Sequence, residues 1–171
     1  PIVKLIHSME KPVIASVNGV AAGAGCSLAL ACDIRIASEY ASFIEVFVNV
    51  GLVPDSGSTW TLPRLVGFGR AMELCLTGRP VKAEEALAIG LVNQVVPSDE
   101  LEDATAKLAK RLASLPAKAL SLTKRLLNQS FENDFKEQLD QEAYAQETAG
   151  RTHDHFEGVV AFIEKRKPNF T

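Results

Sequence analysis

Short apolar runs separated by turn residues dominate the first half of the chain. Val13–Val17 is rich in strand-forming residues and follows Pro12, so it predicts a buried strand. From about Gly25 the chain is apolar on nearly every side, which is typical of a fully buried helix. Cys32–Ala37 and Ala41–Val46 predict two further strands. Strand, helix and strand at this short spacing indicate a layered α/β architecture.

Helical periodicity prevails further along the chain, with one more strand predicted at Leu91–Val96. The predicted helices are Ile2–Met9, Thr59–Leu65, Gly69–Leu76, Lys82–Ile89, Ser98 to about Ala113, Ala117–Gln129, Asn133–Gly150 and Phe156–Lys165. We therefore expect a core at residues 1–97 and a helical region at residues 98–171. The apolar faces of that region need a partner, which is either the core or another subunit.

A turn of small residues, Gly19–Cys26, lies between the first predicted strand and the buried helix. The backbone N–H groups at a helix N-terminus are free to bind an anion or a developing oxyanion. Gly23, Ala24 and Gly25 carry side chains so small that a ligand can approach this backbone closely. Tight packing of the helix against the strand is the alternative explanation for such a run.

The tripeptide Val53-Pro54-Asp55 is the second place with candidate chemistry, and it follows the apolar stretch Phe47–Leu52. Asp55-Ser56-Gly57 has the composition of a turn. On its local sequence alone, Asp55 or Ser56 would cap the helix predicted at Thr59–Leu65. A catalytic carboxylate is the alternative.

Composition excludes several classes of partner. The chain has 171 residues, 47% of them hydrophobic and 23% charged, with a net charge of −3. That charge points to no nucleic-acid or anionic-membrane partner. No apolar run approaches the ~20 residues of a membrane span, and no signal-peptide pattern is present. Pro1-Ile2-Val3 resembles the interior of a longer protein, so we expect a segment before it.

Cysteine and histidine residues show no metal-ligand spacing. Cys26, Cys32 and Cys75 sit in apolar surroundings, and we expect buried free thiols in a reducing compartment. His153 and His155 flank Asp154 in a polar stretch, so we expect them at the surface.

Several stretches of the chain resemble the crotonase superfamily, which includes the enoyl-CoA hydratases and isomerases. They are Pro12–Gly19, Ala22–Cys26, Ala31–Asp33, Gly51–Arg64, Thr77-Gly78, Glu85-Ala86, Gly90–Val92 and Phe162–Phe170. The segment Gly51–Gly57 is most similar to the isomerases of phenylacetate degradation. The resemblance implies a spiral of ββα turns, a helical region that builds a homotrimer or hexamer, and an acyl-CoA thioester substrate. It implies no metal or other cofactor, coenzyme A being part of the substrate, and a cytoplasmic location.

The same resemblance assigns roles to the two candidate places. In this superfamily two backbone N–H groups hold the thioester oxygen as an enolate forms, and one of them falls on Ala24. The second donor comes from an earlier segment, so these residues supply half of the oxyanion hole. Hydratases carry glutamates at the positions of Ser27 and Phe47, which disfavours hydration here. Asp55 falls where double-bond isomerases often carry a carboxylate, and a single carboxylate without an acidic partner suits a proton shuttle.

The resemblance also suggests residues that bind the substrate. Gly23 and Gly25 would line its path at the turn, and an apolar wall from Phe47, Val50, Leu52 and Trp60 would exclude water from Asp55. Phe47 and Trp60 are equally well explained as core residues. Phe162 and Lys165 align with positions that meet the adenine and phosphates of coenzyme A on a neighbouring subunit. A solvated basic tail, Lys165–Lys167, is the competing explanation.

The predicted function is an acyl-CoA isomerase that shifts a double bond through an enolate, with Asp55 as the proton shuttle. Three alternatives stay open. The first is that the protein is an enoyl-CoA hydratase. The second is that it is a dehalogenase-type member in which the aspartate attacks as a nucleophile. The third is a catalytically inactive fragment that only oligomerises.

Overall fold

The computed structural model describes residues 2–170, which form two compact units. The first unit holds residues 2–7 and 13–107, and the second holds residues 8–12 and 108–170. The division near residue 107 falls inside a helix, whereas the sequence predicts a boundary after residue 97. The first half of that helix thus groups with the core.

The first unit contains all the strands of the described residues. Its elements are α1 (Ile2–Ser8), β1 (Ile14–Val17), β2 (Val20–Ala22), α2 (Ala24–Ala31), β3 (Ile34–Ser38), β4 (Ser42–Ile44), the 3₁₀ helix η1 (Val46–Val50), α3 (Ser58–Val66), α4 (Phe68–Thr77), β5 (Val81–Lys82), α5 (Ala83–Ala88), β6 (Gln94–Val96) and the 3₁₀ turn η2 (Ser98–Glu100). α6 (Leu101–Ala113) follows and continues into the second unit.

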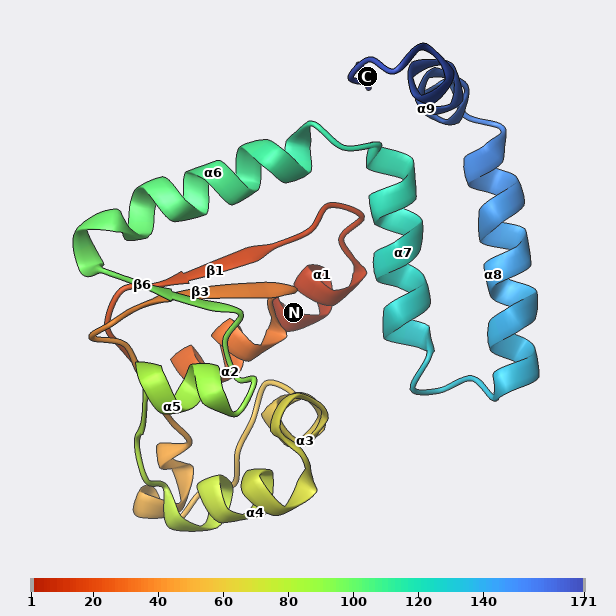
Figure 1. The fold of residues 1–171 in the computed structure, drawn as a ribbon. Coiled ribbons are helices and arrows are strands. Elements are labelled where there is room, and N and C mark those ends of the chain that lie inside the picture. Colours follow the sequence, from red (N-terminus) through yellow and green to blue (C-terminus); the bar gives the residue numbers. More distant parts are fainter. Residues whose placement is uncertain (1, 171) are drawn as a thin grey trace. The chain divides into compact units, whose positions relative to one another are not determined.

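Two small sheets organise this unit. β1, β3 and β6 lie side by side in that order, all parallel, with Ile14 opposite Ile34 and Ile36 opposite Gln94 (Figure 1). In the second sheet β2 pairs in parallel with β4, and β5 pairs with β4 in the antiparallel sense. The chain therefore passes from the first sheet at β1 into the second sheet at β2, which brings the glycine turn to the end of β2.

Helix α2 lies at the centre of the core, as its apolar pattern predicts. Leu30 is among the most buried large side chains of the unit, together with Ile36 and Phe43. α2 packs against α3 and β2. Arg35 is also buried, and two of its N–H groups donate to the carbonyl oxygens of Leu91 and Cys32 at 2.7 and 2.6 Å. This packing fixes the first turn of α2 in the molecule.

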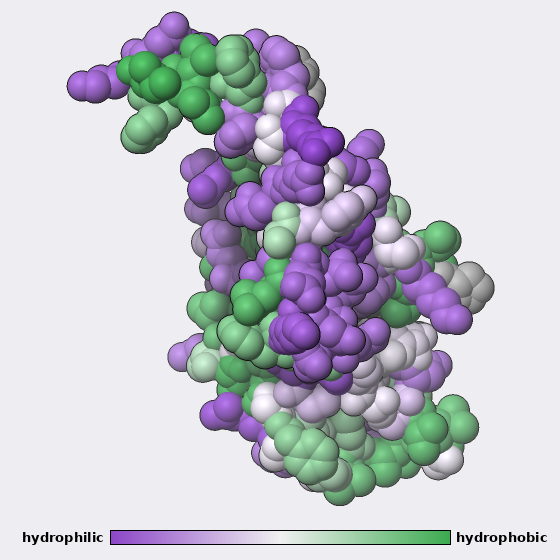
Figure 2. All heavy atoms as spheres, turned by 90° about the vertical axis from the view of Figure 1, so that its right-hand side faces the viewer, coloured by the Kyte–Doolittle hydropathy of each residue, from purple (hydrophilic) through white to green (hydrophobic). Residues whose placement is uncertain are grey.

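The second unit is helical, with α7 (Ala117–Gln129), α8 (Phe135–Gly150) and α9 (His153–Glu164). α7 and α8 form an antiparallel hairpin (Figure 1). The side chain of Asp134 caps α8, and Glu137 completes a capping box. α9 leaves large apolar side chains exposed. Figure 2 shows apolar surface where α9 lies, next to a mainly hydrophilic face of α8. Those side chains are Phe156, Val159, Phe162 and Ile163.

The predicted helices and the strands around α2 are confirmed, and α7 has the predicted bounds. Two strands were not predicted, namely β2 and β5. β2 has three small residues inside the predicted turn, and β5 has only two residues. α9 starts three residues earlier than predicted because the hydroxyl of Thr152 accepts a hydrogen bond from the backbone N–H of His155.

Candidate active site

The glycine turn presents free backbone donors at the N-terminus of α2. Gly23 has φ +53° and caps the helix without a side-chain hydrogen bond. Its N–H donates to the carbonyl of Ile44 at 2.9 Å, which fixes the turn to the end of β4. Ala24 and Gly25 are exposed, and the first N–H groups of a helix have no acceptor within the helix. The site can therefore donate to an anion, as the sequence predicts.

Ser27 is a structural residue of this turn. Its hydroxyl and its N–H both donate to the carbonyl oxygen of Gly23, at 3.2 and 2.9 Å, and the side chain is buried. Both of its donors are therefore used within the turn.

Asp55 lies in a strained turn in front of α3. Ser56 has φ +50°, which is uncommon for a residue with a side chain, and Gly57 has φ +83°. The carbonyl of Asp55 accepts a hydrogen bond from the N–H of Ser58 at 3.0 Å. The carboxyl of Asp55 is exposed and makes no hydrogen bond within residues 2–170.

Capping by Asp55 or Ser56 was wrong as a local prediction. The N-cap of α3 is Gly57, and no side chain bonds to the first turn of that helix. Because the positive φ angles turn the backbone between Asp55 and the helix, the Asp55 carboxyl does not bond to the helix and stays exposed.

The predicted apolar wall is only partly formed. Phe47 is buried beside the glycine turn, where a methyl group placed on Gly23 would lie 3.7 Å from its Cζ atom. Val50 and Leu52 are 70% and 63% exposed. Trp60 instead stacks on Arg64, whose Cζ lies 3.9 Å from the ring centroid, and meets His7 edge to face. Phe47 is thus the wall residue that the described residues bring to the turn.

A second carboxyl, Glu45, was missed by the sequence reasoning, which expected Asp55 to have no acidic partner. Glu45 is 3% exposed, and Oε2 accepts a hydrogen bond from the Ser58 hydroxyl at 3.3 Å. Burial raises the pKa of Glu45. Hydrogen bonds from Cys26 and Ser58 lower this pKa, and the charge of Asp55 raises it further. The two carboxyls are therefore close enough to interact.

Comparisons with known proteins bear on this arrangement. The family described as Enoyl-CoA hydratase/isomerase matches residues 1–171. The chain belongs to that family, within the crotonase superfamily. A 1,2-epoxyphenylacetyl-CoA isomerase of Escherichia coli K12 is 47% identical over 171 residues, and a crotonyl-CoA hydratase of Syntrophomonas wolfei is 46% identical over 167 residues. These matches cover 100% and 98% of this chain but 65% and 64% of those relatives, so the chain spans less than two thirds of their length.

The crotonase-like fold is shown by solved structures. An enoyl-CoA hydratase from Bacillus anthracis superposes with a TM-score of 0.95 at 40% identity, over 98% of this chain and 65% of that one. An enoyl-CoA hydratase from Polaromonas sp. JS666 gives a TM-score of 0.95 at 36% identity, over 99% of this chain and 66% of that one. The predicted fold class and family are thereby confirmed.

Two residues that the family resemblance singles out lie in the second unit. Phe162 is 84% exposed and, with Phe170, lines a pocket of about 430 Å³ formed by α7, α8 and α9. Lys165 is exposed and ends α9 with φ +56°. Their contact with coenzyme A stays a prediction.

Cys26 and Cys32 are buried thiols outside any disulfide, and Cys75 is a half-buried one. Within residues 2–170, no three histidine, cysteine or acidic residues are grouped as a metal site would require. The same residues contain no helix long and apolar enough to cross a membrane. His153 and His155 are exposed, as expected.

Proposed function

We propose that the protein is an acyl-CoA isomerase, which converts a 3-enoyl-CoA or a ring-type CoA thioester to its conjugated isomer. Asp55 is the proton shuttle, and the N–H of Ala24 supplies one oxyanion donor. In the superfamily the second donor comes from a segment outside these residues. The similarity to an E. coli 1,2-epoxyphenylacetyl-CoA isomerase supports this reaction class.

The reaction needs one carboxylate and one place for negative charge. Asp55 removes a proton from C2 of the 3-enoyl thioester, and the electrons pass to the thioester oxygen as a dienolate forms. The Ala24 N–H donates to that oxygen, where charge develops only in the transition state. The Asp55 carboxylic acid then returns the same proton at C4 while the dienolate collapses to the 2-enoyl thioester.

The proposal rests on the exposure and the backbone surroundings of the Asp55 carboxyl. Its carboxyl is exposed at a turn with two successive positive φ angles, and it caps no helix. Gly57 adopts its positive φ without strain, whereas the left-handed conformation of Ser56 costs on the order of 1–3 kcal/mol, and such residues are found preferentially at functional sites. A carboxyl that is exposed, caps no helix and lies beside this strained residue is available to act on a substrate.

Hydration of a 2-enoyl-CoA is the second candidate, because the S. wolfei relative is named a crotonyl-CoA hydratase. In the superfamily's hydratases two glutamates hold the attacking water. Ser27 and Phe47 occupy those positions here, and the extra carboxyl of Glu45 is buried. These facts favour isomerisation.

The two reactions are distinguished by assaying the full-length protein on a 3-enoyl-CoA and on a 2-enoyl-CoA. We expect a higher kcat/KM for the first substrate. Asp55→Asn should lower isomerisation by about 10²-fold or more. A higher kcat/KM for hydration, or an unaffected Asp55→Asn variant, would overturn the proposal.

We further propose a cytoplasmic homotrimer or hexamer in which Phe162 and Lys165 meet coenzyme A bound to a neighbouring subunit. The exposed apolar face of α9 and the thiols outside any disulfide support assembly and a reducing compartment. Phe162→Ala should raise the KM for the thioester and leave kcat unchanged, and analytical ultracentrifugation measures the assembly.

A further inference from the structure

Glu45 is a carboxyl placed in the core of the first unit. It directly follows β4, and its neighbours around a cavity of about 10 Å³ are mainly apolar. That volume admits one water molecule at most, so no substrate reaches the carboxyl. A buried carboxyl is costly unless it is protonated or hydrogen-bonded. The groups around Glu45 therefore decide how the cost of burying its carboxyl is offset.

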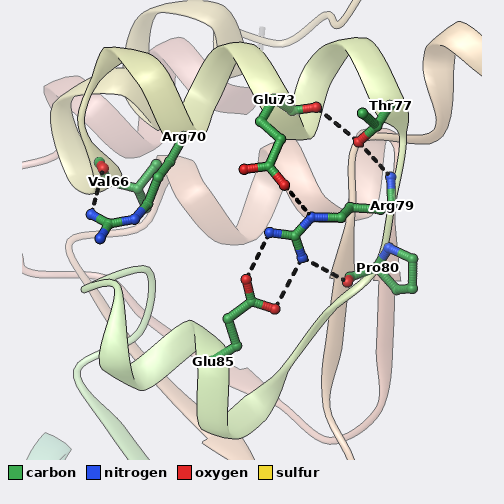
Figure 3. A network of polar contacts seen from close by, with 7 residues as sticks. All are labelled: Val66, Arg70, Glu73, Thr77, Arg79, Pro80 and Glu85. Carbon is green, nitrogen blue, oxygen red and sulfur yellow. Dashed lines mark hydrogen bonds and ion pairs between the residues drawn. The ribbon is translucent and has the colours of Figure 1, made fainter.

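Arg79 does not neutralise Glu45, although it lines the same cavity. Figure 3 shows its guanidinium directed to Glu73 and Glu85. Its Nε donates to Glu73 at 2.7 Å, and two further nitrogens donate to Glu85 at 2.8 and 3.0 Å. The charge of Arg79 is thus already balanced by two carboxylates.

The other groups that face Glu45 do not neutralise it. Cys26 on α2 lies beside the carboxyl, and Cys75 on α4 and Asp55 interact with it electrostatically. Burial raises the pKa of the Glu45 carboxyl and of both thiols, so the neutral forms are favoured. The thiol is a weak donor, and Oε1 has no hydrogen bond of normal geometry within residues 2–170.

The remaining partner of Glu45 connects it to the proposed proton shuttle. Ser58 is the first residue of α3 and is fully buried. Its hydroxyl donates to Glu45 Oε2, and its N–H donates to the carbonyl of Asp55. A continuous chain of two hydrogen bonds therefore runs from Glu45 to the strained turn.

The residue before Glu45 connects to the other half of the site. Ile44 accepts the hydrogen bond from the N–H of Gly23, next to the donor Ala24. Cys26, in the first turn of α2, lies against the Glu45 side chain. The backbone and the side chain at the end of β4 thus hold the N-termini of α2 and α3 together.

We propose that Glu45 is a positioning residue, which through Ser58 holds the Asp55 turn at the distance from the Ala24 N–H that proton transfer requires. This inference rests on the proposed function, because it gives Asp55 the chemistry. Displacement of a reacting group by about 1 Å can cost 10²-fold in rate, so a buried link of this kind affects kcat rather than KM.

The test is a double-mutant cycle on kcat for 3-enoyl-CoA isomerisation in the full-length protein. Glu45→Met and Ser58→Ala each break the link, and we expect each to lower kcat by about tenfold at unchanged KM. The double variant should be no worse than either single one, because both remove the same interaction. Glu45→Gln, which keeps an acceptor for Ser58, should restore most of the kcat lost in Glu45→Met. Glu84→Met, on the exposed face of α5, is the matched control.

Stability separates positioning from a structural role. Replacing both partners of a buried hydrogen bond by apolar groups can be nearly neutral, so the double variant Glu45→Met/Ser58→Ala should melt close to the wild type while being slower. If Glu45→Met keeps its kcat, or if the two effects multiply, the inference is wrong although the proposed function stands. If Asp55→Asn in the same assay is fully active, both fail.

Discussion

The N–H of Gly23 donates to the carbonyl oxygen of Ile44 at 2.9 Å, and this bond joins the glycine turn to the end of β4. The turn therefore has a fixed position relative to Glu45, the next residue along the chain. Gly23 has φ +53°, so the geometry depends on the absence of a side chain.

Gly23→Ala should lower both the free energy of unfolding and kcat. The added methyl group would lie 3.4 Å from Val46 Cγ2, and the backbone of Gly23, with φ +53° and ψ −122°, lies in a region that costs on the order of 1–3 kcal/mol for a residue with a Cβ atom. Urea unfolding and kcat measure the two effects. Gly19→Ala is the control, because a methyl group there meets nothing within 4 Å. Equal stability of the two variants would contradict the assigned geometry.

Glu45→Gln should become more stable than the wild type as the pH rises. The unfolded carboxyl loses its proton near its ordinary value of 4.5, whereas burial in the folded chain raises the pKa of Glu45. The folded wild type is therefore progressively destabilised between pH 4.5 and that higher value, and the glutamine variant is not. Denaturant unfolding across this range measures the difference. A difference that does not change with pH would show that Glu45 titrates normally.

Arg79 should contribute modestly to the packing of α4 and α5. Its bonds to Glu73 and Glu85 raise the pKa of Arg79, but its side chain is 36% exposed, so solvent screens the interaction. Arg79→Met should lower the free energy of unfolding by roughly 0.5–1 kcal/mol, and less at high salt. Arg70→Met is the control, since among residues 2–170 Arg70 makes a hydrogen bond to the carbonyl of Val66 and no ion pair (Figure 3). A loss that persists at high salt would contradict the electrostatic account.

Glu157 should stay ionised in acid. Arg166 binds it at 2.6 and 2.8 Å, the N–H of Asn169 donates at 2.7 Å, and these bonds lower the pKa of Glu157 to about 2. The stability that this carboxylate provides is present above its ordinary value of 4.5 and is lost as the pH falls towards 2. An NMR titration of the carboxyl carbon measures the midpoint. Arg166→Met should move that midpoint towards 4.5, and an unchanged midpoint would argue against the ion pair.

The sequence predicts the larger elements well and the small ones poorly. α7 is found at its predicted bounds because a long amphipathic stretch has a clear period. β2 and β5 have three and two residues, too few for a period, and their pairing with β4 depends on distant residues.

The candidate site likewise has one part that the sequence predicts and one part that it does not. The turn at Gly23–Gly25 follows from local composition and the family resemblance. Glu45 was missed because a single glutamate in an apolar stretch is normally expected on the solvent side of a strand. Only tertiary packing shows that it points inward to Ser58. The αL conformation of Ser56, which prevents capping by Asp55, is likewise set by the turn as a whole.

The most direct test of the account is deuterium exchange at C2 of a 3-enoyl-CoA in deuterated water, with the full-length protein and its Asp55→Asn variant. The account predicts that the wild type exchanges and isomerises, and that the variant loses both by about 10²-fold or more. Full exchange and isomerisation by the variant would contradict the role of Asp55 as the proton shuttle.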